Sequence, residues 1–250
     1  MKIPVRAAVL SSVAALAFAA AGPVRAQGAG DGFLFQRPSG SFTLRGGFAL
    51  ANANSDLFSF TTSNLTVNRG DFSAIDFGAD LAFTIHPRVD LVLDVSHSGM
   101  SKGSEFRNFV DNSQLPIQQT TSFQRTPVTV NARYYLAARG RQIGRYAWIP
   151  NRMVPYVGAG IGMMNYEFTQ KGDFIDHVTL AVFPDAFHSG GWAPMGQLLA
   201  GVEWAMGPGW ALRTEARYLT ASAAPSNDFA GFHRIDLSGV TSSVGFFVRF

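Results

Sequence analysis

The final segment of the chain, Arg234–Phe250, reads RIDLSGVTSSVGFFVRF, and its pattern decides the fold. Successive side chains of a β-strand point to opposite faces, so residues two apart share a face. One face is apolar and holds Val240, Val244, Phe246, Val248 and Phe250. The other face is mostly small or polar and holds Gly239, Thr241, Ser243, Gly245, Phe247 and Arg249. Because an unpaired apolar edge would invite aggregation, we expect this strand to close a cylinder against the first strand, with its apolar face in lipid.

Alternating apolar and polar residues predict seven earlier strands. They cover residues 41–52, 72–85, 88–98, 124–137, 155–168, 192–206 and 210–221. In the fifth strand Gly158, Gly160 and Gly162 share one face. Glycines on the inner face leave room for bulky side chains from the opposite wall of a narrow barrel.

The connections between these strands alternate in length. Residues 86–88 and 207–209 form tight turns, whereas 138–152 is an unusually long turn. Four longer polar segments, 53–70, 99–122, 170–191 and 222–233, are interpreted as loops. The predicted fold is therefore all-β, an eight-stranded antiparallel up-and-down transmembrane β-barrel. Its termini and short turns are expected in the periplasm and its four loops outside the cell.

The amino-terminal residues predict export. Lys2 and Arg6 precede an apolar run over 7–21, and Val24-Arg25-Ala26 offers the small residues of a cleavage site, so 1–26 is predicted to be a signal peptide. Residues 27–38 then form a periplasmic lead, and 39–250 form the barrel. The predicted location is the outer membrane.

Charge and composition exclude several classes of protein. The chain has 20 basic and 17 acidic residues, and removal of Lys2, Arg6 and Arg25 with the signal peptide leaves 17 of each. A neutral mature chain gives no electrostatic reason to expect nucleic-acid binding. The absence of cysteine suits an exported protein without disulfides. No later stretch approaches the eighteen apolar residues of a membrane-spanning helix.

Four segments carry a resemblance to a known family. They are PYVGAGIG (155–162), GVEW (201–204), WALRTEARY (210–218) and VGFFVRF (244–250). In this order and spacing they resemble the OmpA-type eight-stranded outer-membrane β-barrel family over residues 39–250. The resemblance implies that Phe250, with Val248 and Phe246, is a signal read by the barrel-assembly machinery. The family's peptidoglycan-binding domain has no counterpart after the barrel, so anchoring by that domain is not implied.

Charged residues at inward-facing positions predict the state of the lumen. The acids are Asp76, Asp80, Asp90, Asp94, Glu203 and Glu215, and the bases are Arg45, Arg133, Arg213, Arg217 and Arg249. The interior of an eight-stranded barrel is just wide enough for side chains to fill, and a buried charge is costly unless it is paired. We therefore expect a structural network that plugs the lumen. The alternative is a gated ion or proton path.

No catalytic, cofactor-binding or metal site is predicted. His97 and Ser98 are adjacent in a strand and face opposite sides, so they cannot form a nucleophile–base pair. The loop histidines His177, His188 and His233 match no metal-ligand spacing. The long turn carries Arg139, Arg141, Arg145 and Arg152, which either contact anionic headgroups or acidic periplasmic partners or are simply solvated.

The pattern as a whole predicts a non-enzymatic outer-membrane barrel with a structural or surface-interaction role. A narrow channel or carrier for small solutes is the alternative, and a lipid A-modifying enzyme is a third hypothesis. The expected partners are outer-membrane lipid, lipopolysaccharide and, during assembly, the barrel-assembly machinery. We expect a monomer without a cofactor.

Overall fold

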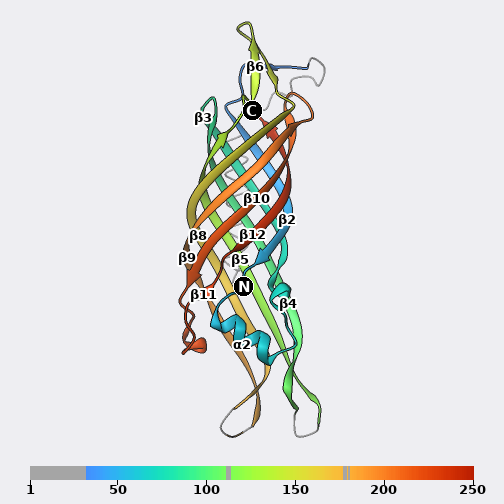
Figure 1. Cartoon of the computed structure of the whole chain (residues 1–250), viewed down its shortest axis with the longest axis vertical. Coiled ribbons are helices and arrows are strands. Elements are labelled where there is room, and N and C mark those ends of the chain that lie inside the picture. Colours follow the sequence, from blue (N-terminus) through green and yellow to red (C-terminus); the bar gives the residue numbers. More distant parts are fainter. Residues whose placement is uncertain (1–31, 111–113, 177–178, 180) are drawn as a thin grey trace, which may run out of the picture.

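The first and last long strands meet and close a ring. A computed structural model describes residues 32–110, 114–176, 179 and 181–250, so the predicted signal peptide and the start of the lead lie outside the described residues. The ring consists of β2 (Gly40–Ala51), β3 (Ala74–His86), β4 (Val89–Val110), β5 (Pro116–Tyr135), β8 (Met153–Ile175), β9 (Val182–Ala205), β10 (Trp210–Ala223) and β12 (Gly239–Arg249). Each strand pairs with its neighbours antiparallel, and β12 returns to β2 (Figure 1). The predicted eight-stranded barrel is confirmed.

The register of the closing pair places the two faces as expected. Phe246 lies opposite Leu44, with both side chains on the outside, and Gly245 lies opposite Arg45 on the inside. In β12 buried and exposed residues alternate without exception. The outer wall is apolar, and Leu44, Phe77, Leu93, Ile161, Leu198 and Val244 are all exposed there. This is the pattern of a barrel surrounded by lipid.

Two of the predicted loops, 99–122 and 170–191, are wrong, because most of their residues continue the neighbouring strands. β4 and β5 run for 22 and 20 residues, and β8 and β9 run for 23 and 24. A tilted strand crosses a membrane in about 9–11 residues, so these strands project far beyond the apolar wall. Their outer segments are polar, which hid them from a search for apolar alternation. We call the end reached by these hairpins the hairpin end, and the end with connections 87–88 and 206–209 the turn end (Figure 1).

The segment predicted as the first loop, 53–70, contains a helix. α2 (Asp56–Asn64) buries Leu57, Phe58 and Thr61, and the 3₁₀ turn η1 (Arg69–Phe72) follows it. The many Asn, Ser and Thr residues of this segment favour loops in isolation, but burial of the apolar residues stabilises the helix here. Within the described part of the chain, no helix is both long and apolar enough to span a membrane.

The long turn at 138–152 and the lead form a small sheet at the turn end. β6 (Gly140–Ile143) and β7 (Ala147–Pro150) make a hairpin, and β1 (Leu34–Phe35) adds to β7. Residues 34–35 of the predicted lead are thus part of a strand. The pairing holds residues 34–35 against the hairpin at the turn end.

The expected start of the last strand also needs correction. The short strand β11 (Ile235–Asp236) pairs with β10, after the 3₁₀ turn η2 (Asn227–Phe229). β12 begins only at Gly239. Ser238 interrupts the segment, because its hydroxyl contacts both the amide and the carbonyl of Ala221.

Candidate functional site

The inward charges of β3, β4 and β10 meet across the lumen. Arg213 Nη1 lies 3.1 Å from Asp80 Oδ2, and Arg217 Nη1 lies 2.7 Å from Asp94 Oδ1. Arg45, on β2, donates two hydrogen bonds of 2.6 and 3.0 Å to the same Asp94 carboxylate. These side chains are all nearly inaccessible to solvent. Alternation along four different strands places them in one layer, which we call the ion-pair layer.

Two glutamates complete this layer. Arg213 Nη2 donates to Glu203 over 2.9 Å, and Arg217 Nε donates to Glu215. Two tyrosines that the sequence analysis did not select also take part. Tyr156 donates to Glu215 over 2.6 Å, and the Tyr135 hydroxyl lies 2.9 Å from carboxylate oxygens of both Asp90 and Glu203. Both tyrosines occupy inward-facing positions, Tyr156 in β8 and Tyr135 in β5, and the alternation of these strands could have identified them. Only the charged residues at inward-facing positions were selected.

The remaining predicted lumen residues are buried but less directly paired. Arg133 Nη2 lies 3.7 Å from Glu215 and 3.9 Å from Asp80, and its guanidinium stacks 4.9 Å from the centre of the Tyr156 ring. Arg249 Nη2 lies 3.7 Å from Glu203. Asp76 is buried on the hairpin-end side of the layer, and among the described residues no arginine nitrogen lies within 4.0 Å of it.

Two arginines were assigned to the wrong place or missed. Arg139 was expected in the basic turn, but it is 6 % exposed and donates to Asp90 over 2.8 Å, so it belongs to the ion-pair layer. Arg125 lay in the predicted strand 124–137, at an inward-facing position, and was not selected. It is buried, and its Nη1 donates to the Leu237 carbonyl over 3.0 Å.

Toward the hairpin end the lumen is filled by apolar side chains. Phe58 of α2 lies at the centre, with ring centroids 4.7 Å from Phe72, 5.4 Å from Phe123 and 5.7 Å from Phe168. Phe229, from η2, adds to Phe168 at 5.5 Å. We call these five rings the aromatic cluster. Inward positions of β5 and β8 thus meet a helix and a loop that enter the barrel mouth.

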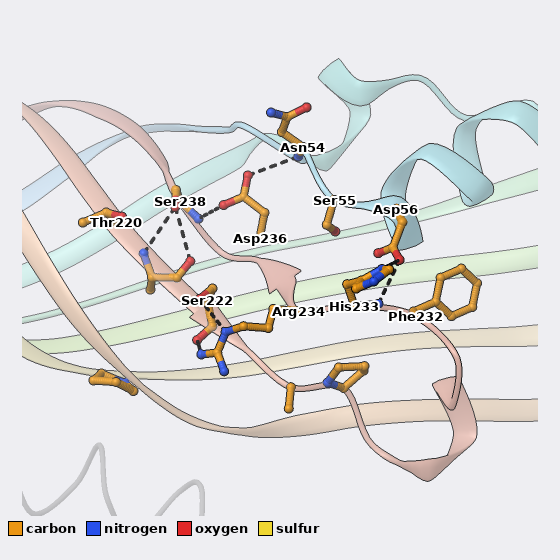
Figure 2. Close-up of a pocket in the computed structure, with 14 residues that line it drawn as sticks. Asn54, Ser55, Asp56, Thr220, Ser222, Phe232, His233, Arg234, Asp236 and Ser238 are labelled. Atoms are coloured by element: carbon orange, nitrogen blue, oxygen red, sulfur yellow. Dashed lines mark hydrogen bonds and ion pairs between the residues drawn. The ribbon is translucent and has the colours of Figure 1, made fainter.

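A hollow of about 900 Å³ opens on the surface beside α2, lined by residues of α2, β10 and β11 (Figure 2). The His233 amide and Nδ1 each lie 2.8 Å from Asp56 Oδ2. The backbone hydrogen bond from His233, followed by that from its side chain, lowers the pKa of Asp56 below 3.8. Arg234 donates to Ser222, and Asp236 accepts from the amides of Asn54 and Ser238. These charged side chains hold neighbouring segments together.

The candidate catalytic and metal residues remain apart. His97 is exposed and its Nδ1 lies 2.8 Å from Thr126 Oγ1, whereas Ser98 is buried on the inner face. His188, on β9, lies far from His97 in the ring, and its Nε2 is 3.6 Å from Glu167 on the neighbouring strand β8. His177 lies outside the described residues. In the described ranges, no three His, Asp or Glu side chains gather as metal ligands.

The residues of the expected assembly signal lie on the outer wall at the turn end. Phe246 packs against Trp210 with ring centroids 5.6 Å apart, and Phe250 is 40 % exposed. The amide and the carbonyl of Phe250 both hydrogen-bond to Gly40, at 3.0 and 3.1 Å. The last residue therefore takes part in the closure of the ring.

Charges outside the lumen are distributed unevenly along the barrel. At the turn end the exposed charged side chains of the described residues are five arginines, Arg37, Arg88, Arg141, Arg145 and Arg152. At the hairpin end nine acids among the described residues lie outside the lumen: Asp56, Asp71, Glu105, Glu167, Asp173, Asp176, Asp185, Asp228 and Asp236. Five bases accompany them there: Arg69, Lys102, Arg107, Lys171 and Arg234. The two ends therefore have opposite net charge.

Comparison with known proteins finds similarity only among solved structures. No protein-family model matches the chain, and no curated protein matches it. Neisserial surface protein A is 14 % identical, with a TM-score of 0.49, over 88 % of this chain and 98 % of that one. Outer membrane protein W of E. coli is 14 % identical, with a TM-score of 0.41, over 86 % and 100 %. The attachment invasion locus protein Ail of Yersinia pestis, crystallised with sucrose octasulfate, is 12 % identical, with a TM-score of 0.38, over 84 % and 98 %.

At these identities the comparisons show similarity of fold alone. The assignment of the fold rests on the strand pairings of this chain. Eight antiparallel strands close on themselves, with an apolar outer wall and polar side chains within. The chain is an eight-stranded β-barrel of the outer-membrane type.

Proposed function

We propose that this protein is a non-enzymatic outer-membrane barrel whose lumen is closed and whose hairpin end presents surfaces to the exterior. The observation that carries the proposal is the pairing of inward charges across the lumen, as in the 3.1 Å contact of Arg213 with Asp80 and the 2.7 Å contact of Arg217 with Asp94. Such a network fills the narrow interior with side chains that hold one another in place.

The aromatic cluster supports the proposal of a closed lumen, because it fills the lumen at a second depth in the barrel. Phe58, Phe123 and Phe168 are at most 2 % exposed and occupy the lumen between the ion-pair layer and the hairpin end. An ion that crossed this layer would have to leave its water without polar groups to replace it. A conducting path would therefore need both layers to open.

The predicted export signal and the apolar wall support an outer-membrane location. Leu93 and Leu198 are 46 % and 62 % exposed, which would be unfavourable in water. The short connections favour the turn end as the periplasmic side. On this orientation the acidic hairpin end faces outward, where it contributes a surface for contacts with other molecules.

Planar-bilayer recording of the purified protein tests closure. The wild type should produce no steady conductance steps, because both layers block the lumen. The matched variant Phe58→Gly with Arg213→Ala removes one member of each layer and should conduct. Steady steps from the wild type would reverse the proposal and favour a narrow channel.

A separate assay tests the absence of enzymatic activity. Incubation of the purified protein with lipopolysaccharide should release no fatty acid, since His97 and Ser98 face opposite sides of the wall. Release that disappears in the His97→Ala variant would instead establish a lipid-modifying enzyme.

A further inference from the structure

The small sheet β1-β7-β6 at the turn end has one buried face and one exposed face. Trp148, on β7, is 4 % exposed, and the Arg249 guanidinium lies 5.7 Å from the centre of its ring. Because Arg249 points into the lumen, Trp148 does so too. Its neighbours in β7, Ala147 and Ile149, point the opposite way, as successive residues of a strand must.

The outward face combines apolar side chains with arginines. Ala147 lies opposite Phe35 of β1 and Ile143 of β6, and Ile149 lies opposite Arg141. Phe35 is 59 % exposed and Ile143 is 51 % exposed. We call these residues, together with the hairpin tip Arg145 and Tyr146, the outward sheet face.

Specific hydrogen bonds hold this face in a fixed position. The Gln36 amide donates to the Tyr146 carbonyl over 2.8 Å, and the Asn151 amide donates to the Arg139 carbonyl over 2.9 Å. Arg37 Nη2 donates to the Pro87 carbonyl over 2.7 Å, which ties the lead to the barrel rim. A preorganised surface of this kind loses little conformational entropy when a partner binds.

The charge of the turn end identifies the chemistry of a partner. The five exposed arginines of this end have no exposed acidic side chain beside them among the described residues. A ligand with carboxylates would match them, since arginine binds carboxylates with paired, charge-assisted hydrogen bonds. The exposed Phe35 and Ile143 add a requirement for apolar groups on the same ligand.

We propose that the outward sheet face binds an acidic peptide segment, carrying apolar side chains, of a protein on the turn-end side. Membrane lipid fits this face less well than it fits the barrel rim. The β6–β7 hairpin rises beyond the rim along the length of the barrel, whereas lipid surrounds the wall (Figure 1). Arg88 and Arg152, at the ends of wall strands, are the arginines placed to meet headgroups.

Fluorescence anisotropy of the full chain in detergent micelles tests the proposal. The probe is a fluorescein-labelled synthetic peptide in which glutamate alternates with leucine. Arg141→Glu with Arg145→Glu should raise the Kd by about tenfold or more, because two attractive charges become repulsive. Ile143→Ser should weaken binding in high salt as well, where screening leaves the apolar contacts dominant.

Matched variants decide between the possible outcomes. Arg69→Glu with Arg107→Glu makes the same charge change at the hairpin end and should leave the Kd unchanged. Heat-modifiable migration on a gel confirms that each variant is folded. Equal loss of affinity in both double variants, or equal affinity for a peptide of lysine and leucine, would overturn the proposal. Binding that depends on Arg88 and Arg152, and is displaced by anionic phospholipid vesicles, would assign this end to lipid instead. None of these outcomes depends on whether the lumen is closed.

Discussion

Arg213 occupies the most connected position among the lumen charges. Its guanidinium contacts Thr43, Asp80 and Glu203, and it also stacks on Phe247 at 4.5 Å. These partners come from β2, β3, β9 and β12. One side chain on β10 thus links strands on several sides of the ring. Its loss should therefore weaken contacts with several strands and not only one ion pair.

Arg213→Ala should lower the free energy of unfolding by about 3–5 kcal/mol, as for a broken buried ion pair. Denaturant unfolding of the protein in micelles, followed by tryptophan fluorescence, measures this change. Arg107→Ala, an exposed change at the hairpin end, is the control and should alter stability by about 0.5 kcal/mol or less. Equal stability of both variants would contradict a paired lumen.

Asp56 makes a pH-sensitive contact at the rim of the surface hollow. Its pKa is lowered below 3.8, so its contribution is fully present above that pH and is lost as the pH falls through the folded-state value. Protection of the His233 amide from hydrogen exchange, corrected for the intrinsic rate, should therefore fall on acidification in that range. In Asp56→Asn the protection should be lower at neutral pH and should not change further. Asp185→Asn, which leaves this contact intact, should behave like the wild type.

At the scale of the element, α2 shows how tertiary burial can decide local structure. Its buried side is short, with Leu57, Phe58 and Thr61, and its other side is polar except for Phe60. The helix has only 9 residues and would be marginal alone in water. Its stability therefore depends on the aromatic cluster that it completes.

Phe58→Ala should cost about 3–5 kcal/mol, because it leaves a cavity among Phe72, Phe123 and Phe168. Phe60→Ala is the matched change on the same helix, where the ring is 43 % exposed, and should cost about 1 kcal/mol or less. Denaturant unfolding of both variants gives the comparison. A similar cost at both positions would mean that α2 does not depend on the cluster.

The sequence predicted a strand correctly where its residues alternate with a period of two and its outer residues face lipid. In β12 and β3 the outer residues face lipid, so apolar alternation reveals both the strand and its faces. The outer halves of β4 and β8 leave the lipid, so their outward residues are polar and show no apolar alternation. Arg125 lay at the start of the predicted strand 124–137, but it was not selected as a lumen residue. α2 and Trp148 depend on contacts between segments far apart in the chain, and no local pattern reports such contacts.

At the scale of the whole molecule, the outward face of the barrel should tolerate a charged residue only where that face lies outside the lipid. Leu93→Arg places a charge near the middle of the wall and should cost roughly 2–4 kcal/mol. Gln118→Arg puts the same side chain on an outward position of β5, beyond the apolar wall, and should cost little. Unfolding of both variants from lipid vesicles measures the difference. Equal tolerance would place the membrane elsewhere on the barrel.

The pairing of β12 with β2 also has a kinetic consequence. Seven of the eight strand pairs join successive strands of the ring, and each needs only the segment between those two strands to close. The eighth joins Ser41 to Arg249 and has by far the greatest sequence separation. High contact order slows folding, so formation of this seam should be the late, rate-limiting event. Until it forms, both seam strands are unpaired edges, and the time spent in that open state determines how long the chain is exposed to aggregation.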